Sequence, residues 1–130
     1  MGGFGAKRTP RLAARYADEY NLPFLPLGLI ADRIEAVREA CEKAGREPAT
    51  LRLSTAQVVC VGANEPDYAR RAEAIGRPPD QLRGGGVAGT LDEAREYLEK
   101  LSGLGITRTY LQVLDLADHD HLRLVAELLR

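Results

Sequence analysis

The stretch from Leu51 to Val61 constrains the fold of this 130-residue chain more than any other segment. It opens with apolar and polar residues in alternation and ends in a continuous apolar run from Val58 to Val61. Such a run is typical of a strand covered on both faces, as strands of parallel sheets are. Segments with helical spacing lie before and after it, so the sequence predicts an α/β protein built from right-handed βαβ units.

Local signals predict the remaining elements. Thr9 followed by Pro10 indicates an N-cap and a first helical position. The expected order is helix 10–18, strand 20–24, helix 30–44, strand 51–61, helix 64–76, helix 90–103, strand 106–114 and helix 118–129. Caps are expected from Asn64, from Asp118 and from Thr90 with Glu93, and the last helix is expected to turn Leu122, Val125, Ala126 and Leu129 inward. Arg77–Gly89, with two prolines and four glycines, is predicted to be a long loop.

The length predicts one domain over residues 1–130. Basic and acidic side chains nearly cancel, at 18 and 19, so no global field draws nucleic acid or an anionic membrane surface. No long apolar run or secretory signal is visible, and we expect a cytoplasmic protein. Cys41 and Cys60 show no ligand spacing, and buried reduced thiols are expected. About three parallel strands leave one sheet face to be covered, either by helices in a small doubly wound sandwich or by further strands of a barrel.

A glycine-rich segment, Gly2-Gly3-Phe4-Gly5, leads through Lys7 and Arg8 directly into the first predicted helix. Glycines let the backbone approach an oxyanion, free N–H groups at a helix start donate to it, and the two cations add charge. A phosphate is the expected target. No Gly-Lys-Ser/Thr sequence closes the segment and no strand is predicted before it, so it is neither a P-loop nor a dinucleotide fingerprint. On local sequence alone, a flexible terminus is an equal alternative.

Other residues with functional chemistry favour structural roles. The two histidines lie in Asp118-His119-Asp120-His121, but successive residues at a helix start point in different directions, so we expect acidic caps and no metal site. Asp115, Gln112 and Asn21 follow or end predicted strands, where barrel enzymes place functional groups. Hydrogen bonding within a loop is the interpretation we favour for Asp115 and Asn21.

Residues 2–21 resemble the part of F420-dependent luciferase-like oxidoreductases in which a Gly-Gly-Gly-Gly turn leads into an Arg-Thr-Leu-Arg-Leu-Ala-Ala-Arg-Tyr-Ala-Asp helix. Residues 38–50 resemble a later helix of that family and its Gly-Arg-Asp-Pro turn. Residues 89–93 resemble its Gly-Thr-Pro-Glu-Glu helix start, and residues 110–115 and 120–122 resemble its closing strand and helix. The resemblance runs in the same order along nearly the whole chain, with Phe4 where the family often has glycine.

This resemblance implies the C-terminal portion of a TIM-like (β/α)8 barrel, with about three parallel strands and flanking helices. It implies a fragment or truncated relative of an oxidoreductase that transfers hydride between the deazaflavin coenzyme F420, or alternatively FMN, and an organic substrate. Gly3, Gly5, Lys7, Arg8 and Thr9 are implied as contacts of the coenzyme phosphate. No residue is identified as a catalytic base or hydride donor, so we expect weak coenzyme binding and no turnover. The alternative is a non-catalytic α/β binding module that associates with itself; in either case the expected partner is a second copy or the missing half of a barrel.

Overall fold

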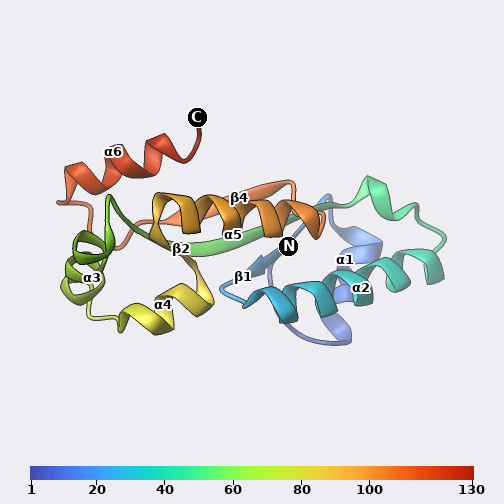
Figure 1. Cartoon of the computed structure of the whole chain (residues 1–130). Helices are drawn as coiled ribbons and strands as arrows, with labels where there is room; N and C mark the ends of the chain where they lie inside the picture. Colours follow the sequence, from blue (N-terminus) through green and yellow to red (C-terminus); the bar gives the residue numbers. More distant parts are fainter. The chain divides into compact units, whose positions relative to one another are not determined.

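The computed structural model describes residues 1–130 and confirms the predicted α/β class. Helices and strands alternate along the chain except where α4 follows α3 (Figure 1), and β1 with β2 and β2 with β3 pair in parallel. The elements are α1 Arg8–Tyr16, β1 Glu19–Pro23, α2 Leu27–Lys43, a 3-10 turn Pro48–Thr50, β2 Arg52–Gly62, α3 Glu65–Ala74, α4 Pro79–Gly85, β3 Val87–Thr90, α5 Leu91–Gly103, β4 Arg108–Gln112 and α6 His119–Glu127.

The residues group into two compact units. The first unit comprises Met1–Ala56 with Leu101–Tyr110, and the second comprises Gln57–Lys100 with Leu111–Arg130. In the first unit, β1 pairs with the first half of β2; in the second unit, β3 pairs with the last residues of β2. β4 also pairs with β2, which makes four strands where about three were expected. None of the helices combines the length and the apolar character needed to cross a membrane.

One face of the β1–β2 pair supplies the core of the first unit. Tyr20 and Leu22 of β1 are fully buried, and Leu53 of β2 is nearly so. Helix α1 packs against α2, whose Ile30 and Val37 are also buried. Burying aliphatic and aromatic side chains of this size is the main stabilising contribution, at roughly 1.5–3 kcal/mol each.

The opposite face of the same strand pair is polar. The parallel register places Glu19 beside Arg52 and Asn21 beside Ser54, and we call these four residues the polar face. Glu19 forms ion pairs with Arg108 at 2.9 Å and with Arg52 at 3.6 Å, and Asn21 Nδ2 donates to Ser54 Oγ at 2.9 Å. Hydrogen bonds and ion pairs therefore line the sheet face that the sequence analysis left to be covered.

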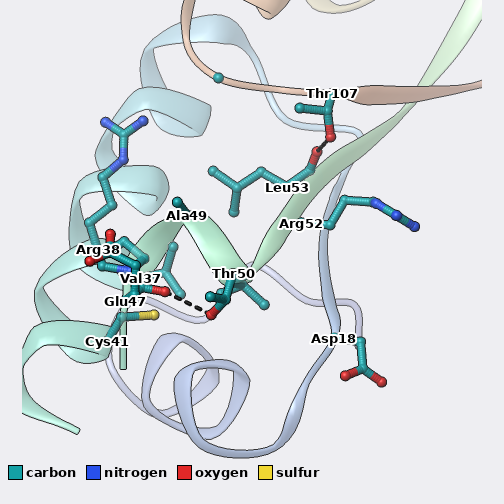
Figure 2. A pocket seen from close by; sticks show the side chains of 13 residues that line it. Asp18, Val37, Arg38, Cys41, Glu47, Ala49, Thr50, Arg52, Leu53 and Thr107 are labelled. Atoms are coloured by element: carbon teal, nitrogen blue, oxygen red, sulfur yellow. Dashed lines mark hydrogen bonds between the residues drawn. The ribbon is translucent and has the colours of Figure 1, made fainter. Parts of the chain in front are cut away.

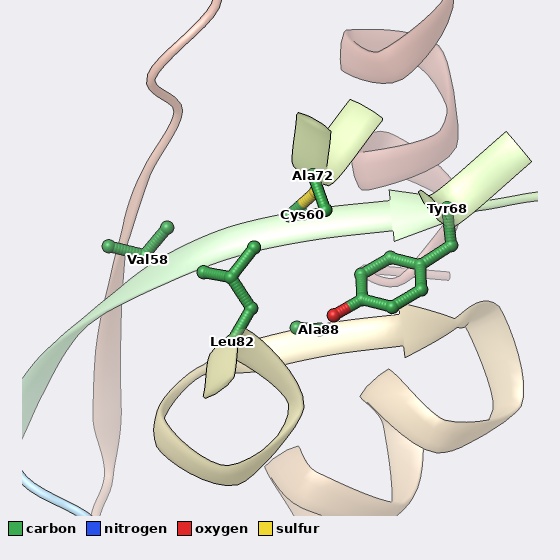
Figure 3. Packing of buried hydrophobic residues seen from close by; sticks show 6 residues of the cluster. All are labelled: Val58, Cys60, Tyr68, Ala72, Leu82 and Ala88. Atoms are coloured by element: carbon green, nitrogen blue, oxygen red, sulfur yellow. The ribbon is translucent and has the colours of Figure 1, made fainter. Parts of the chain in front are cut away.

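The core of the second unit centres on an apolar cluster between β2, β3, α3 and α4 (Figure 3). Its members are Val58, Cys60, Tyr68, Ala72, Leu82 and Ala88. The buried Tyr68 hydroxyl donates to the carbonyl oxygen of Pro79 at 2.6 Å, so its polar end is satisfied. Burial raises the pKa of the Cys60 thiol to about 11. Cys41 is buried as well and both cysteines are free, which confirms the prediction of buried reduced thiols.

Two predictions about the second unit were wrong. Arg77–Gly89 is not one long loop, because it contains α4 and begins β3; the buried Leu82 anchors α4 in the core. The last helix does not turn its leucines inward. Its Leu122 and Ala126 are exposed, and Leu129, just beyond its end, is 76% exposed, whereas Val125 is buried.

The predicted helix caps are confirmed. The side chain of Asn64 accepts from the Asp67 N–H at 3.0 Å, and Asp118 accepts from the His121 N–H at 2.8 Å. Glu93 accepts from the Thr90 N–H at 2.7 Å, and Thr90 Oγ1 accepts from the Glu93 N–H at 3.5 Å, so both bonds of the expected capping box are present. Each bond satisfies a backbone donor that a helix start would otherwise leave free.

A buried polar network joins α6 and α3 to the end of β2 in the second unit. His121 Nε2 accepts from the Val61 N–H at 3.0 Å, so this ring nitrogen carries no proton and the imidazole is neutral. Arg71 donates to Asp118 at 2.8 Å, to the Val61 carbonyl at 3.3 Å and to Asp67. Burial, followed by the charge of Arg71, lowers the pKa of His121 below its ordinary value of 6.5; Asp118, Asp115 and Asp67 act in the opposite direction.

This lowered pKa predicts a loss of stability in mild acid. The unfolded chain takes up a proton at His121 more readily than the folded chain, so stability is complete above about pH 6.5 and falls as the pH drops toward the folded-state pKa. His121→Gln can still accept from Val61 but does not titrate. Urea unfolding at about pH 7.5 and pH 5.5 should therefore show a loss, of about 1 kcal/mol, in the parent chain but not in this variant. His119→Gln, on the exposed side of the helix start, should lose as much stability between the two pH values as the parent chain. If His119→Gln abolished this loss instead, His121 would not be its cause.

Candidate functional site

A short strand-like segment leads into the glycine turn of the first unit. The Asn21 N–H donates to the Met1 carbonyl at 2.8 Å, the Gly3 N–H donates to the Asn21 carbonyl at 3.2 Å, and Gly2 forms a parallel bridge with Asn21. No strand precedes the glycines, as expected, and the parallel bridge at Gly2 is the only sheet-like pairing before the turn. Because this segment runs parallel to β1, the turn lies toward the carboxyl end of β1, and barrel enzymes bind their ligands at the carboxyl ends of their strands.

The helix after the turn starts earlier than predicted. α1 begins at Arg8, with Lys7 as its N-cap and no side-chain capping bond, so the prediction of Thr9 as N-cap was wrong. Thr9 instead turns its side chain toward the glycines. A Cβ added at Gly5 would lie 2.6 Å from Thr9 Oγ1, and one added at Gly3 would lie 3.1 Å from Thr9 Cγ2. Gly3, whose φ is +151°, also has a backbone conformation that favours glycine.

The backbone N–H groups from Phe4 to Thr9 form an uninterrupted row of donors. None of these six groups has an acceptor within the protein. The first turn of α1 contains no acidic side chain, whereas α3 and α6 are capped by their own Asn64 and Asp118. α2 likewise begins without a side-chain cap. A row of free donors at a positive helix end is suited to an external anion such as a phosphate.

The surroundings of the turn are positively charged. Lys7 and Arg8 are exposed and form no ion pair, so their charge remains available to a ligand. A cavity of about 620 Å3 lies between α1 and α2, next to the turn. Its charged lining residues are Lys7, Arg11, Arg15, Lys43 and Glu39. Of the five predicted contacts, the structure thus brings Gly3, Gly5 and Thr9 together and leaves Lys7 and Arg8 exposed next to them in the chain.

Sequence reasoning missed two residues that support the turn from behind. Arg33 of α2 donates through Nε to the Phe4 carbonyl at 3.0 Å, and the buried Tyr20 hydroxyl points to the Gly3 carbonyl at 3.3 Å. Burial raises the pKa of Tyr20, so this hydroxyl keeps its proton to donate. Neither residue belongs to a local motif, and nothing in the sequence pairs Arg33 with a carbonyl 29 positions away.

The remaining candidates have structural contacts. Asp115 Oδ1 accepts from the Ala117 N–H at 3.0 Å, as a loop hydrogen bond, and Asn21 donates to Ser54 across the polar face. Gln112 is exposed at the end of β4. His119 is exposed and His121 is buried, and no group of three His, Cys, Asp or Glu side chains is arranged to hold a metal ion.

A second and larger cavity does not include the glycine turn (Figure 2). It measures about 870 Å3 and includes Asp18, just before β1, Arg52, the first residue of β2, and Thr107, just before β4. These positions mark the amino ends of the strands, whereas barrel enzymes carry their chemistry at the carboxyl ends. The volume alone therefore assigns this cavity no role, and the glycine turn is the better candidate.

Comparison with solved structures shows the fold. An F420-dependent secondary alcohol dehydrogenase in complex with an F420-acetone adduct matches 99% of this chain with a TM-score of 0.76 and 18% identity. The coenzyme F420 dependent tetrahydromethanopterin reductase from Methanopyrus kandleri matches 98% of this chain with a TM-score of 0.76 and 16% identity. The oxygenating constituent of 3,6-diketocamphane monooxygenase from Pseudomonas putida, in complex with FMN, matches 97% of this chain with a TM-score of 0.67 and 16% identity. The chain spans 48%, 48% and 46% of these three chains, less than half of each.

These proteins contain TIM-like barrels, so the parallel strands and flanking helices of this chain correspond to part of such a barrel. Of the two arrangements that the sequence allowed, the barrel slice is the one that the structure supports. No curated protein matches the chain. A family model described as luciferase-like monooxygenase matches residues 1–117, which include the glycine turn and every strand. The chain belongs to the luciferase-like monooxygenase family.

Proposed function

We propose that this chain holds the phosphate of a flavin-type coenzyme, F420 or alternatively FMN, as part of an oxidoreductase of the luciferase-like family. The observation that supports it is the row of six unbonded backbone N–H groups from Phe4 to Thr9, at the start of a helix with no acidic residue in its first turn. Solved structures that share the fold contain F420 in one case and FMN in another. Both coenzymes carry a phosphate, so the turn suits either of them.

The residues of the turn fit a phosphate. Gly3 and Gly5 lack the Cβ atoms that would run into Thr9, so the backbone can lie close to an oxyanion. The N–H groups of Gly5, Arg8 and Thr9 can donate to phosphate oxygens, and the Thr9 hydroxyl, directed into the turn, can add another bond. Lys7 and Arg8 add positive charge next to the turn, and no carboxylate of the chain neutralises them.

Within such an enzyme, the part played by these residues is binding and orientation. The coenzyme, when bound, supplies the hydride chemistry toward an organic substrate. This chain anchors the phosphate end through backbone donors and so fixes where the rest of the molecule can extend. No side chain around the turn is assigned as a general acid or base. We therefore expect the isolated chain to bind coenzyme weakly and to turn over no substrate.

Titration calorimetry with F420, FMN and inorganic phosphate tests this function. All three should bind the parent chain and compete with one another. Gly5→Ala should weaken each by about tenfold or more, because its Cβ meets Thr9 Oγ1 and displaces the N–H groups on which a charged hydrogen bond worth roughly 1.5–3 kcal/mol depends.

Gly103→Ala is the matched control, since a Cβ at this position at the end of α5 meets nothing within 4 Å. It should bind all three ligands like the parent chain. Equal affinities of the parent chain and Gly5→Ala, or no competition between FMN and phosphate, would argue against the phosphate role of the turn.

A second candidate function is self-association without catalysis, which exposed leucines of the second unit favour. Leu116 and Leu129 are 71% and 76% exposed, and Leu122 is exposed on α6. Apolar side chains left in water on one helix and its flanks are typical of association sites. Sedimentation equilibrium of the parent chain and of a variant with Leu122→Ser and Leu129→Ser tests this candidate: self-association should give a defined oligomer that the variant loses, and a parent chain that remains monomeric would refute it.

A further inference from the structure

Two carbonyl groups of the glycine turn are held from behind. The Phe4 carbonyl accepts from Arg33 Nε at 3.0 Å, and the Gly3 carbonyl accepts from the Tyr20 hydroxyl at 3.3 Å. Arg33 comes from α2 and Tyr20 from β1, and both belong to the same compact unit as the turn. Arg33 forms no ion pair with a carboxylate, and its hydrogen bond goes to the backbone of the turn.

The direction of these carbonyls fixes the direction of the neighbouring N–H groups. The chain has no cis peptide bonds, and in a planar trans peptide the C=O of one residue points opposite to the N–H of the next. Holding the Gly3 carbonyl toward Tyr20 therefore directs the Phe4 N–H away from Tyr20. Holding the Phe4 carbonyl toward Arg33 likewise directs the Gly5 N–H away from Arg33. These are the first two donors of the row that has no acceptor in the protein.

We infer that Arg33 and Tyr20 are positioning residues of the phosphate turn: they anchor its carbonyls so that the Phe4 and Gly5 N–H groups face the ligand before it binds. The inference rests on the proposed function of the turn as a phosphate site. Preset donors do not have to be reoriented during binding, so the affinity gained from each one is not spent on ordering the backbone. Glycines allow the turn its close approach but also leave it conformationally free, which is why it needs such anchors.

The geometry ranks the two anchors. At 3.0 Å, the Arg33 bond lies at the usual N–H···O distance and has a charged donor, whereas 3.3 Å is long for an O–H···O bond. Arg33 is therefore the stronger anchor, and it acts on the peptide that carries the Gly5 N–H. Its guanidinium also adds positive charge near the site, so a test must separate the hydrogen bond from the charge.

The first measurement needs no ligand. Residual dipolar couplings of the Phe4 and Gly5 amides report the direction of their N–H bonds. Arg33→Lys keeps the charge but loses the planar Nε donor, and Arg33→Met loses both. Arg38→Met is the matched control, because Arg38 lies exposed on the same helix and has no contact with the turn. Both Arg33 variants should average the Gly5 coupling toward zero while Arg38→Met keeps the parent value; an unchanged Gly5 coupling in Arg33→Met would overturn the inference.

The second measurement is the affinity for inorganic phosphate and FMN. Arg33→Met should bind each about tenfold more weakly than the parent chain, a loss of about one charged hydrogen bond, and Arg33→Lys should recover less than half of the loss on a logarithmic scale. Full recovery with Arg33→Lys would show that only the charge matters and would overturn the positioning role. A parent chain that binds neither ligand would refute the proposed function, yet the dipolar couplings would still decide whether Arg33 orients the turn.

Tyr20 is tested by removing its hydroxyl alone. Tyr20→Phe should weaken phosphate binding by about twofold to threefold, less than the Arg33 variants, in keeping with its longer bond. Tyr68→Phe deletes a matched buried hydroxyl, whose 2.6 Å bond goes to the Pro79 carbonyl in the other unit, and should leave phosphate affinity unchanged. Equal phosphate affinities of these two variants would remove Tyr20 from the set of positioning residues.

Discussion

Replacing Gly62 with alanine should abolish the stable folded state of the second unit. Gly62 ends β2 immediately before α3, and an added Cβ would clash with the backbone N of Tyr68 and lie 2.7 Å from its Cα and 2.8 Å from the Asn64 carbonyl oxygen. These are backbone atoms in the first turn of a helix, so no side chain can rotate to relieve the clash. Overpacking that can only be relieved by moving a helix away from the core costs about 3 kcal/mol or more.

Circular dichroism and urea unfolding measure this effect. Gly62→Ala should lose the cooperative unfolding transition at room temperature, or retain it with a greatly lowered midpoint, because α3 carries Tyr68 and Ala72 into the core. The control is Gly84→Ala within α4, where an added Cβ meets nothing within 4 Å. That variant should be more stable than the parent chain by about 0.5–1 kcal/mol, since alanine favours the helix. Comparable unfolding curves for both variants would show that β2 and α3 are not packed this closely.

Arg71→Met should cost about 3 kcal/mol of the free energy of unfolding. The Arg71 side chain is 7% exposed and bonds to Asp118, to Asp67 and to the Val61 carbonyl. Methionine fills much of the same volume but leaves two partly buried carboxylates without their cation. Breaking a buried pair by removing one partner is strongly destabilising because the remaining charge stays desolvated.

The neighbouring Arg70 provides a matched comparison, because its side chain is 61% exposed and pairs with the same Asp67 at 2.8 Å. Arg70→Met should change stability by no more than about 0.5 kcal/mol, as exposed pairs contribute little. Arg71 also lowers the pKa of Asp118 to about 2, so the ionised Asp118 stabilises the fold above its ordinary pKa of 3.8 and this contribution is lost as the pH falls toward 2. Arg71→Met should therefore flatten the acid unfolding profile in this range; an unaltered profile would show that Arg71 does not control Asp118.

Most of the fold could be predicted because its signals are local. The apolar run in β2 and the capping residues Asn64 and Asp118 each mark an element within a few positions, and the structure contains these elements. α4 and β3 were missed because their glycines and prolines signal a loop, whereas the burial of Leu82, a tertiary contact, stabilises a helix there. The leucines of α6 were misplaced because spacing defines a helical stripe but does not say which stripe faces the core. In the structure, the buried face of α6 contains His121, which accepts a hydrogen bond from β2.

The candidate site was predicted in part for the same reason. Glycines next to Lys7 and Arg8 at a helix start are visible in sequence, and the family resemblance gave them a ligand. The position of Thr9 could not be read correctly, because Thr-Pro usually begins a helix and here the helix starts one residue before Thr9. Arg33 and Tyr20 were beyond reach because their contacts join parts of the chain that are 29 and 17 residues apart.

The polar face of the β1–β2 pair determines how copies of the chain behave when they are crowded together. Sheet faces lined with apolar side chains stack on one another and drive aggregation. Stacking onto Glu19, Asn21 and Arg52 would instead strip water from the Glu19–Arg52 ion pair and the Asn21 amide without offering them new partners, which is unfavourable. Ser54 is already fully buried. The charges on this part of a barrel therefore disfavour stacking on apolar surfaces. They favour contact with a surface that carries complementary polar groups.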